Sequence, residues 1–504
     1  MRFSRLAGRI AFIVCGLLTA DRSSALPVAS GGGGFQVVPS AVKLVRNYDR
    51  AQLIVTRLGT DGKVGEYSDD LTQAAVYQSD APQIVSVDSN GRLLAQGNGK
   101  ATVTVTVAGT ARRVAVEVSG VLPQAKVDYF HDIGPVLSKT GCNSATCHAT
   151  QYGKGGFKLS VFGYAPDEDY RAMIRDWQGR RVNLVEPDKS MILLKPTMAV
   201  PHGGNKRLEI GTVEYDMLRS WLLGGAIPPT GKETKVTKIV VTPNVRVGQV
   251  GFTQQLRVVA TYSDGAERDV TALAKYDSMD EGFVTVTPGG MTRAVGKGQS
   301  PVVVRFEGQA EAALITVPYS DKIELKGWKN NNFVDEFAAA KFREVGIEPS
   351  GTCDDAVFVR RAYLDAVGTL PTTEAVRAFL DSKDPQKREH LVDALLGLTG
   401  DATKDVHNNA YAAYWSVKWA DLIRSSSDNV GEQGMWALHN WIQDSFRGNK
   451  RYDQFVRELV LAKGSIYMDG PSNFYRIASN PPDMAETTAQ LFLGVRLQCA
   501  RCHH

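Results

Sequence analysis

Residues 101–120 read ATVTVTVAGTARRVAVEVSG, and their pattern points to β structure. Apolar and polar side chains alternate before Gly109 and alternate again after it. Alternation with a period of two is typical of strands that bury one face, and a glycine between two such runs is a turn signal. The stretch therefore predicts a β-hairpin whose two strands turn one face toward a core.

The same pattern occurs a second time, 199 residues further along the chain. The step Asp-Leu-Thr that begins at Asp70 matches the step Asp-Val-Thr that begins at Asp269. Other matches at the same offset are Tyr77 with Tyr276, Ser79 with Ser278, VSV at 85–87 with VTV at 284–286, AQGNG at 95–99 with AVGKG at 294–298, and Gly109 with Gly308. Self-similarity of this kind indicates one module used twice, and short alternating strands predict a small β-sandwich for each copy.

Length and composition limit the kind of protein. The chain has 504 residues, an apolar fraction of 43% and a formal net charge of +4. This length is too great for one core and predicts three or four domains. No long basic or acidic run occurs, which argues against a nucleic-acid partner. The acidic residues are scattered and are predicted to be solvated surface charge. No Ser–His–Asp order, phosphate loop or paired-carboxylate site stands out, so no catalytic residue is assigned.

The N-terminus has the features of an export signal. Three arginines precede an apolar run at 10–20, and the small residues Ser23, Ser24 and Ala25 follow it. This order is typical of a secretory signal peptide, here residues 1–25. The eleven residues of the run are too few to span a bilayer. We therefore expect export to the periplasm or the cell surface, with no membrane span after cleavage.

A cysteine cluster lies between the two copies of the repeat. Residues 140–150 read TGCNSATCHAT, so Cys142 and Cys147 stand five positions apart and His148 follows directly. Covalent haem of the c type needs two thiols for the two vinyl groups and an imidazole directly behind the second thiol for the iron. Small residues in the gap allow the loop to bulge. The cluster predicts haem c on Cys142 and Cys147, with His148 as the proximal ligand.

The last six residues, CARCHH, repeat the arrangement with a two-residue gap. Cys499, Cys502 and His503 predict a second haem c site. Only His504 follows, so we expect the chain to stop short of a complete pocket, with one haem in this form and two in a longer one. Two alternatives stay open for both clusters: a disulfide within each pair, or a zinc site that pools thiolates and imidazoles.

A haem iron often takes a sixth ligand, and the candidates lie in one segment. Residues 191–207 read MILLKPTMAVPHGGNKR. Met191 sits in an apolar run and is predicted to be core. Met198 and His202 lie in the following loop, where either could cover the distal face, so both are candidates.

The remaining patterns are helical. The region between the two β copies has an amphipathic helix before the cysteine cluster and another near its end, and from about residue 331 the pattern is helical throughout. The sequence therefore predicts a signal peptide at 1–25, β modules at 36–119 and 236–318, a helical haem domain at 125–230 and a helical domain at 331–504.

Four segments resemble known families. The two β copies resemble bacterial Ig-like group 2 domains, on the Asp-x-Thr step, the Tyr-x-Ser step and the Ala-x-Gly-x-Gly loop before a hairpin. The segment from DIGPVLSKTGCNSATCH to VPHGGNKRLEIG resembles the cytochrome-c-like domain of large secreted planctomycete proteins. The segment from FVRRAYLDAVGTLPT to FLGVRLQCARCH resembles the helical domain of unknown function that accompanies it, and the relatives continue beyond this motif.

The resemblance implies a fold class and a function. The fold would be two all-β Ig-like sandwiches, an all-α cytochrome c-like domain between them and a C-terminal all-α domain. The "VPHGG" loop of the relatives keeps its histidine, which favours His202 over Met198 as the distal ligand. We expect an exported c-type haem protein for electron transfer, with redox partner proteins and with cell-surface or polysaccharide contacts through the Ig-like modules. The alternatives are a surface-binding or structural protein, and an oxidoreductase whose active site lies in the helical domain.

Overall fold

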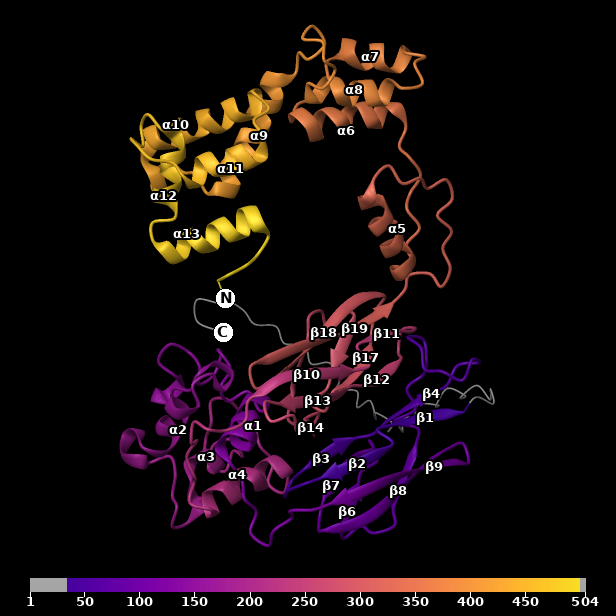
Figure 1. The fold of residues 1–504 in the computed structure, drawn as a ribbon, viewed down its shortest axis with the longest axis vertical. Helices are drawn as coiled ribbons and strands as arrows, with labels where there is room; N and C mark the ends of the chain where they lie inside the picture. Colours follow the sequence, from indigo (N-terminus) through magenta and orange to yellow (C-terminus); the bar gives the residue numbers. More distant parts are fainter. Residues whose placement is uncertain (1–33, 499–504) are drawn as a thin grey trace, which may run out of the picture. The chain divides into compact units, whose positions relative to one another are not determined.

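The computed structural model describes residues 34–498, and the chain divides between Ile347 and Glu348 into two compact units (Figure 1). The signal peptide at 1–25 and the C-terminal Cys499, Cys502 and His503 lie outside the described residues. The first unit is rich in β-strands and the second is helical. The predicted multidomain class, β before α, is confirmed at this level.

The first β module contains the stretch that opened the sequence analysis. Its strands are β1 Phe35–Val38, β2 Ala41–Leu44, β3 Arg50–Gln52, β4 Ile54–Arg57, β5 Val76–Ser79, β6 Val85–Val87, β7 Arg92–Ala95, β8 Gly99–Val107 and β9 Thr110–Val118. They form sheets of order β2-β9-β8-β5, β3-β7-β6 and β1-β4, in which only β2 and β9 pair in parallel. The predicted hairpin is β8 and β9, and its inward valines are at most 2% exposed, as the alternation predicted: Val103, Val105, Val114 and Val116.

The second β module repeats this topology. Its strands are β10 Val236–Thr242, β11 Val245–Val247, β12 Thr253–Gln255, β13 Arg257–Tyr262, β14 Glu267–Asp269, β15 Lys275–Ser278, β16 Val284–Val286, β17 Met291–Ala294, β18 Gly298–Phe306 and β19 Gln309–Val317. The sheet order β11-β19-β18-β15 matches β2-β9-β8-β5, and β11 again pairs with β19 in parallel. The repeat seen in the sequence is thus a repeat of structure.

The aspartates of the two Asp-x-Thr steps join the modules reciprocally. The carboxylate of Asp70 accepts the backbone N–H of Gln255 in the second module at 2.5 Å. The carboxylate of Asp269 accepts the backbone N–H of Gln52 in the first module at 3.1 Å. The same contact made in both directions is the mark of a pseudo-twofold interface.

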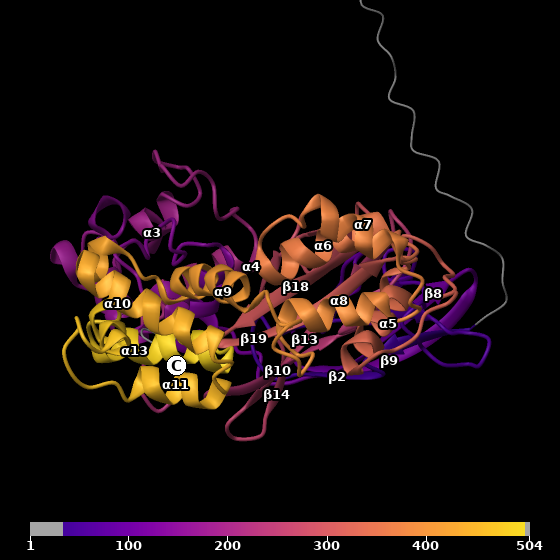
Figure 2. The ribbon, with the colours of Figure 1, turned by 90° about the horizontal axis from the view of Figure 1, so that it is seen from above.

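The segment between the modules contains short helices and long irregular stretches. A π-helical turn, Tyr129–Ile133, leads into α1 Gly134–Lys139, and α2 Pro166–Ile174, α3 Met191–Leu194 and α4 Val213–Leu223 follow. In both ribbon views these helices gather at one end of the first unit (Figures 1 and 2). Its core contains Tyr129 and Trp221, whose ring centroids are 5.7 Å apart. The expected all-α cytochrome c fold is not shown by these short elements, and the predicted domain limits stay predictions.

A cluster of charges at the start of α1 ties the three segments of the first unit together. Asp132 is 3% exposed and accepts hydrogen bonds from Arg46 of the first module and from Arg268 of the second, the latter at 3.5 Å. Arg268 also contacts Asp49 of the first module at 3.1 Å. Because buried charges are costly unless paired, these contacts require the three segments to stay together. We call Arg46, Asp49, Asp132 and Arg268 the junction.

Over its described residues, 348–498, the second unit has helices as its only regular structure. Its α-helices are α6 Asp355–Val367, α7 Thr373–Asp381, α8 Lys387–Leu396, α9 Asn408–Ile423, α10 Ser427–Arg447, α11 Tyr452–Val460, α12 Phe474–Ile477 and α13 Pro481–Thr488, whereas α5 Phe333–Val345 belongs to the first unit. Two apolar clusters form its interior, one around Val359 and Leu395 and one around Leu438 and Phe474. Among the described residues, no helix has the length and apolarity that a membrane crossing needs.

Candidate functional site

The loop after α1 closes on itself and brings its histidine back to its first cysteine. α1 ends at Lys139, and Gly141 has a φ of +79°, a left-handed conformation in which glycine avoids a steric penalty. The backbone N–H of His148 then donates to the carbonyl of Cys142 at 3.0 Å. The gap between the two cysteines is thus accommodated as a closed loop, and both thiols and the imidazole line the same cavity.

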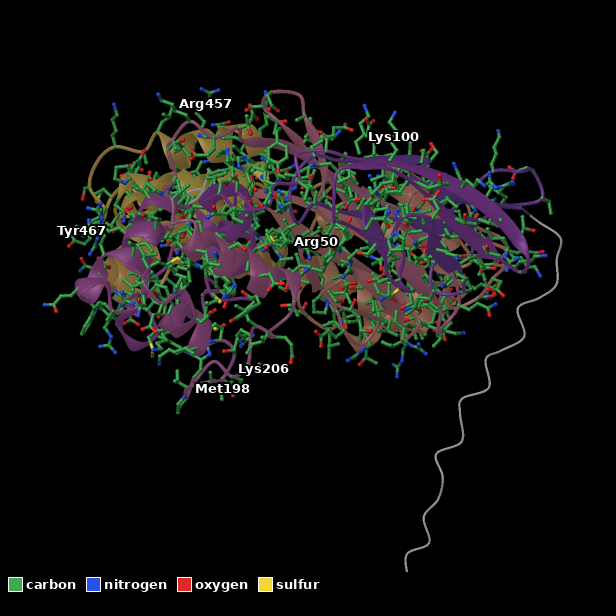
Figure 3. The ribbon with its side chains drawn as sticks, turned by 90° about the horizontal axis from the view of Figure 1, so that it is seen from below. Arg50, Lys100, Met198, Lys206, Arg457 and Tyr467 are labelled. Carbon is green, nitrogen blue, oxygen red and sulfur yellow. The ribbon has the colours of Figure 1, made fainter. Side chains whose placement is uncertain are left out.

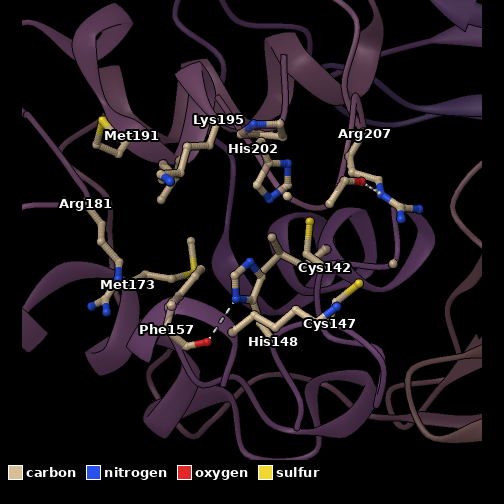
Figure 4. A pocket seen from close by; sticks show the side chains of 18 of the residues that line it. Cys142, Cys147, His148, Phe157, Met173, Arg181, Met191, Lys195, His202 and Arg207 are labelled. Atoms are coloured by element: carbon tan, nitrogen blue, oxygen red, sulfur yellow. Dashed lines mark hydrogen bonds between the residues drawn. The ribbon is translucent and has the colours of Figure 1, made fainter. Parts of the chain in front are cut away.

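This cavity has a volume of about 440 Å³ (Figure 4). Four of the residues predicted from the sequence line it together: Cys142, Cys147, His148 and His202. Apolar side chains supply much of the rest of its wall: Leu137, Phe157, Met173, Met191, Ile192 and Pro196. Met198 is not part of the wall; it is 45% exposed and projects outward beside Lys206 (Figure 3).

Both histidines are fixed in the same tautomer by backbone carbonyls. The Nδ1 of His148 lies 2.9 Å from the carbonyl oxygen of Phe157, and the Nδ1 of His202 lies 2.8 Å from that of Asn205. A carbonyl only accepts, so each Nδ1 carries the proton and donates it. Burial lowers the pKa of His148, which keeps this ring neutral near pH 7. The His148 ring therefore presents an unprotonated Nε2, the form that binds a metal ion. In His202 the backbone carbonyl likewise contacts Nδ1 and leaves Nε2 for another partner.

The two imidazoles face one another across the cavity (Figure 4). Their ring centroids are 6.3 Å apart and their planes differ by only 13°. An imidazole nitrogen binds a metal ion at about 2 Å, and the ring centre lies roughly 1 Å behind that nitrogen, so two imidazoles on opposite sides of one ion place their centres roughly 6 Å apart. The observed spacing fits a pair of axial ligands.

The two cysteines are free thiols in different surroundings. Burial raises the pKa of Cys142, whose sulfur lies 3.3 Å from the hydroxyl of Thr140. The pKa of Cys147 is lowered, chiefly by its hydrogen bond with the side chain of Ser144. Of the two, Cys147 is the thiol that ionises more readily. The disulfide alternative for this cluster stays a prediction.

Sequence analysis missed the charged part of the cavity wall. Its five cations are Lys154, Arg180, Arg181, Lys195 and Arg207. A single lysine or arginine in a loop is normally solvated, so nothing in the one-dimensional pattern marks these residues. The glycines around Lys154 are the one local hint that this segment is part of a site. At Gly153 and Gly156 a Cβ would come close to Phe157 and Trp177. The second predicted haem site, at Cys499, Cys502 and His503, lies beyond the described residues and stays a prediction.

Comparisons with known proteins give partial matches. Residues 333–504 match the family described as PSCyt2, protein of unknown function (DUF1549). The chain is 33% identical over 82 residues to ice-binding protein 1 of Shewanella frigidimarina, a match that covers 16% of this chain and 9% of that protein. Domains 5–6 of the S-layer protein SbsC cover 56% of this chain and 97% of their own, at 12% identity and a TM-score of 0.23. Domains 1–6 of SbsC cover 53% and 23%, at 9% identity and a TM-score of 0.15. TM-scores this low do not show a shared overall fold.

These findings correct the predicted classification as a metal-binding cytochrome for electron transfer. The matches named above are a family of unknown function, an ice-binding protein and S-layer domains. Within residues 34–498, no three His, Cys, Asp or Glu side chains gather into a group that could hold a metal ion. The zinc alternative pools ligands from both cysteine clusters, and the second cluster lies outside the described residues, so it stays an alternative.

Proposed function

We propose that the cavity holds a covalently attached haem of the c type. Cys142 and Cys147 would hold it through thioethers, and His148 and His202 would offer imidazole nitrogens to its iron. The observation that carries this proposal is the parallel imidazole pair at 6.3 Å, in which the Nδ1 of each ring contacts a backbone carbonyl.

The residues present fit such a group in two further respects. The thiols are free and line the same cavity as the imidazoles, which is what addition to two vinyl groups requires. The aromatic ring of Phe157 and the thioether of Met173 offer apolar contacts to a flat macrocycle. When bound, such a group supplies a one-electron iron couple. The chain's own part is to anchor it, to orient it between two fixed imidazoles and to shield it from water.

The identity of the second iron ligand, His202 or Met198, is the point on which this proposal can be tested. His202 lies across the cavity from His148, whereas Met198 is exposed outside it. The test uses the full chain with Cys499→Ala and Cys502→Ala, matured in a host with haem-attachment machinery, so that only the first site is loaded. Denatured protein should keep its haem on a stained gel. His202→Ala should change the low-spin absorption spectrum, and the matched Met198→Ala should leave it unchanged. Loss of all haem on denaturation contradicts the proposal, and the reverse pattern of the two variants contradicts the choice of His202.

A second candidate function is contact with a surface through the β modules, taken as residues 36–119 and 236–318. The observation that favours it is the likeness to an ice-binding protein in a chain that carries two copies of one β module. This candidate includes export to the periplasm or the cell surface. Purified protein should bind isolated cell envelopes or envelope polysaccharide, and Cys142→Ala with Cys147→Ala should bind equally well. An absence of binding, or its loss in the cysteine variant, contradicts a function carried by the modules.

A further inference from the structure

The charged side chains that line the cavity all have the same sign. Its five cations, named above, are accompanied by no Asp or Glu side chain in the lining. Among residues 34–498, none of the five forms an ion pair with a carboxylate. A concave surface lined by one sign of charge attracts ligands of the opposite sign.

Arg181 is the decisive member of this set. It is 9% exposed, and its guanidinium donates to the backbone carbonyls of Ala172 at 2.8 Å and of Gly156 at 2.9 Å. Its charge also lies over the ring of Phe157, 4.7 Å from the centroid. All of these partners are neutral. The charge of Asp176 acts on Arg181 from a distance, but Asp176 forms its ion pair with Arg171. A buried charge without a paired counter-ion is costly, so an arginine held in this way at a cavity wall favours an anion that binds there.

Two of the five cations lie away from the thiols. Figure 4 shows Arg181 and Lys195 on one side of the two imidazoles, and Cys142, Cys147 and Arg207 on the other. Protoporphyrin has the same polarity, because its vinyl groups lie toward one edge of the ring and its two propionates at the opposite edge. A ring whose vinyl edge meets the thiols therefore turns its carboxylates toward Arg181 and Lys195.

We infer that Arg181 and Lys195 bind the carboxylates of the tetrapyrrole, and that this contact sets its orientation before the thioethers form. The inference rests on the proposed function. It makes the cavity selective for an anionic, dicarboxylate tetrapyrrole over an uncharged one of the same shape.

Ester derivatives of the porphyrin test this selectivity. The full chain with Cys499→Ala and Cys502→Ala, produced without haem-attachment machinery, is titrated with iron protoporphyrin IX and with its dimethyl ester, and dissociation constants are read from the visible spectrum. Loss of one hydrogen bond to a charged group weakens binding by roughly tenfold or more. We expect the free acid to bind at least about tenfold more tightly than the diester. Arg181→Gln should remove most of that difference by weakening the free acid alone.

Two lysines give a matched pair in case Arg181→Gln fails to fold. Lys195 is exposed and lines the cavity, whereas Lys189 is exposed and pairs with Glu186 outside it. Lys195→Gln should lower the preference for the free acid several-fold, and Lys189→Gln should leave it unchanged. Equal binding of acid and diester by the unsubstituted cavity overturns the inference and leaves the proposed function intact. An equal effect of both lysine variants also overturns it. Binding of neither porphyrin overturns the proposed function itself.

Discussion

Replacing Glu307 with glutamine probes how the three segments of the first unit are held together. Glu307 lies in the turn between β18 and β19, and both of its carboxylate oxygens are buried without a hydrogen-bond partner. The charged and titratable groups around it are His131, Arg268, Asp128 and Arg46, all close to the junction. Burial raises the pKa of Glu307 to about 7. The folded protein therefore holds this carboxyl in its protonated form over a pH range in which the unfolded chain has released the proton.

The magnitude follows from the difference between the two pKa values. A rise from 4.5 to about 7 corresponds to roughly 3 kcal/mol of unfolding free energy. The unfolded chain binds fewer protons between these values, so the stability from this group is complete below pH 4.5 and is lost as the pH rises through 7. Glu307→Gln cannot ionise. We expect it to be about as stable as the unchanged protein at pH 4.5 and more stable by up to about 3 kcal/mol at pH 8.

Urea unfolding at pH 4.5, 6 and 8 measures this effect as a difference between the two proteins. Because the chain has two compact units, the transition of the first unit must be followed by itself, for example through hydrogen exchange of its β-strands. Glu311→Gln on β19 is the matched control, because this glutamate is exposed, and its difference should not change with pH. A difference for Glu307→Gln that is the same at pH 4.5 and at pH 8 would refute the reasoning.

Two further pairs of variants test packing and backbone conformation. Trp221→Ala should cost about 3–5 kcal/mol of unfolding free energy because its side chain is 1% exposed, whereas Trp177→Ala, which is 62% exposed in the same segment, should cost less than about 1 kcal/mol; similar losses in urea unfolding would contradict the packing of this core. Gly120→Ala should lower the thermal stability more than Gly62→Ala does. Both glycines have positive φ, but only at Gly120 would a Cβ lie 2.2 Å from the carbonyl oxygen of Val45. Left-handed strain alone costs about 1–2 kcal/mol, and equal thermal shifts for the two variants would show that the clash relaxes freely.

The β modules were predictable because their signals are local. Alternation over β8 and β9 gave the strands, and the buried faces follow it residue by residue. The turns at Gly109 and Gly308 have φ values of +81° and +79°, as two glycines at the same place in a repeat suggest. A strand pattern depends on neighbours two residues away, and such neighbours can be read directly from the chain.

Buried charges were not predictable, because burial depends on segments distant in sequence. The sequence analysis predicted that the acidic residues are solvated surface charge, and this is wrong for Glu307 and Asp132. In the first module the position equivalent to Glu307 is Ala108, so the repeat gave no warning. The segment between the modules, which contains Asp128 and His131, packs against the second module. It covers the turn between β18 and β19, which would otherwise be exposed to solvent.

The resemblance favoured His202 over Met198, but the positions of the two side chains relative to the cavity could not be read from the sequence. Both lie in one loop of the sequence, and residue type alone admits either as a ligand. The loop makes a turn in which Asn205 N–H donates to the carbonyl of His202, while the His202 ring donates back to the carbonyl of Asn205. This turn directs the imidazole into the cavity. Met198 precedes the turn and is left exposed.

The cysteine loop is positioned by both β modules, and this links the two candidate functions. The helical turn before α1 carries Asp132, which Arg46 of the first module and Arg268 of the second contact. At the other end of α1, the Lys139 amine donates to two backbone carbonyls of the second module. Cys142 follows three residues later. The cysteine loop is therefore held at both ends of α1 by the two β modules. The proposed site would need such support, because two ligands keep a fixed spacing only where their backbone is held. The proposed contact with a surface would use the same two modules, so the two candidate functions share one rigid frame.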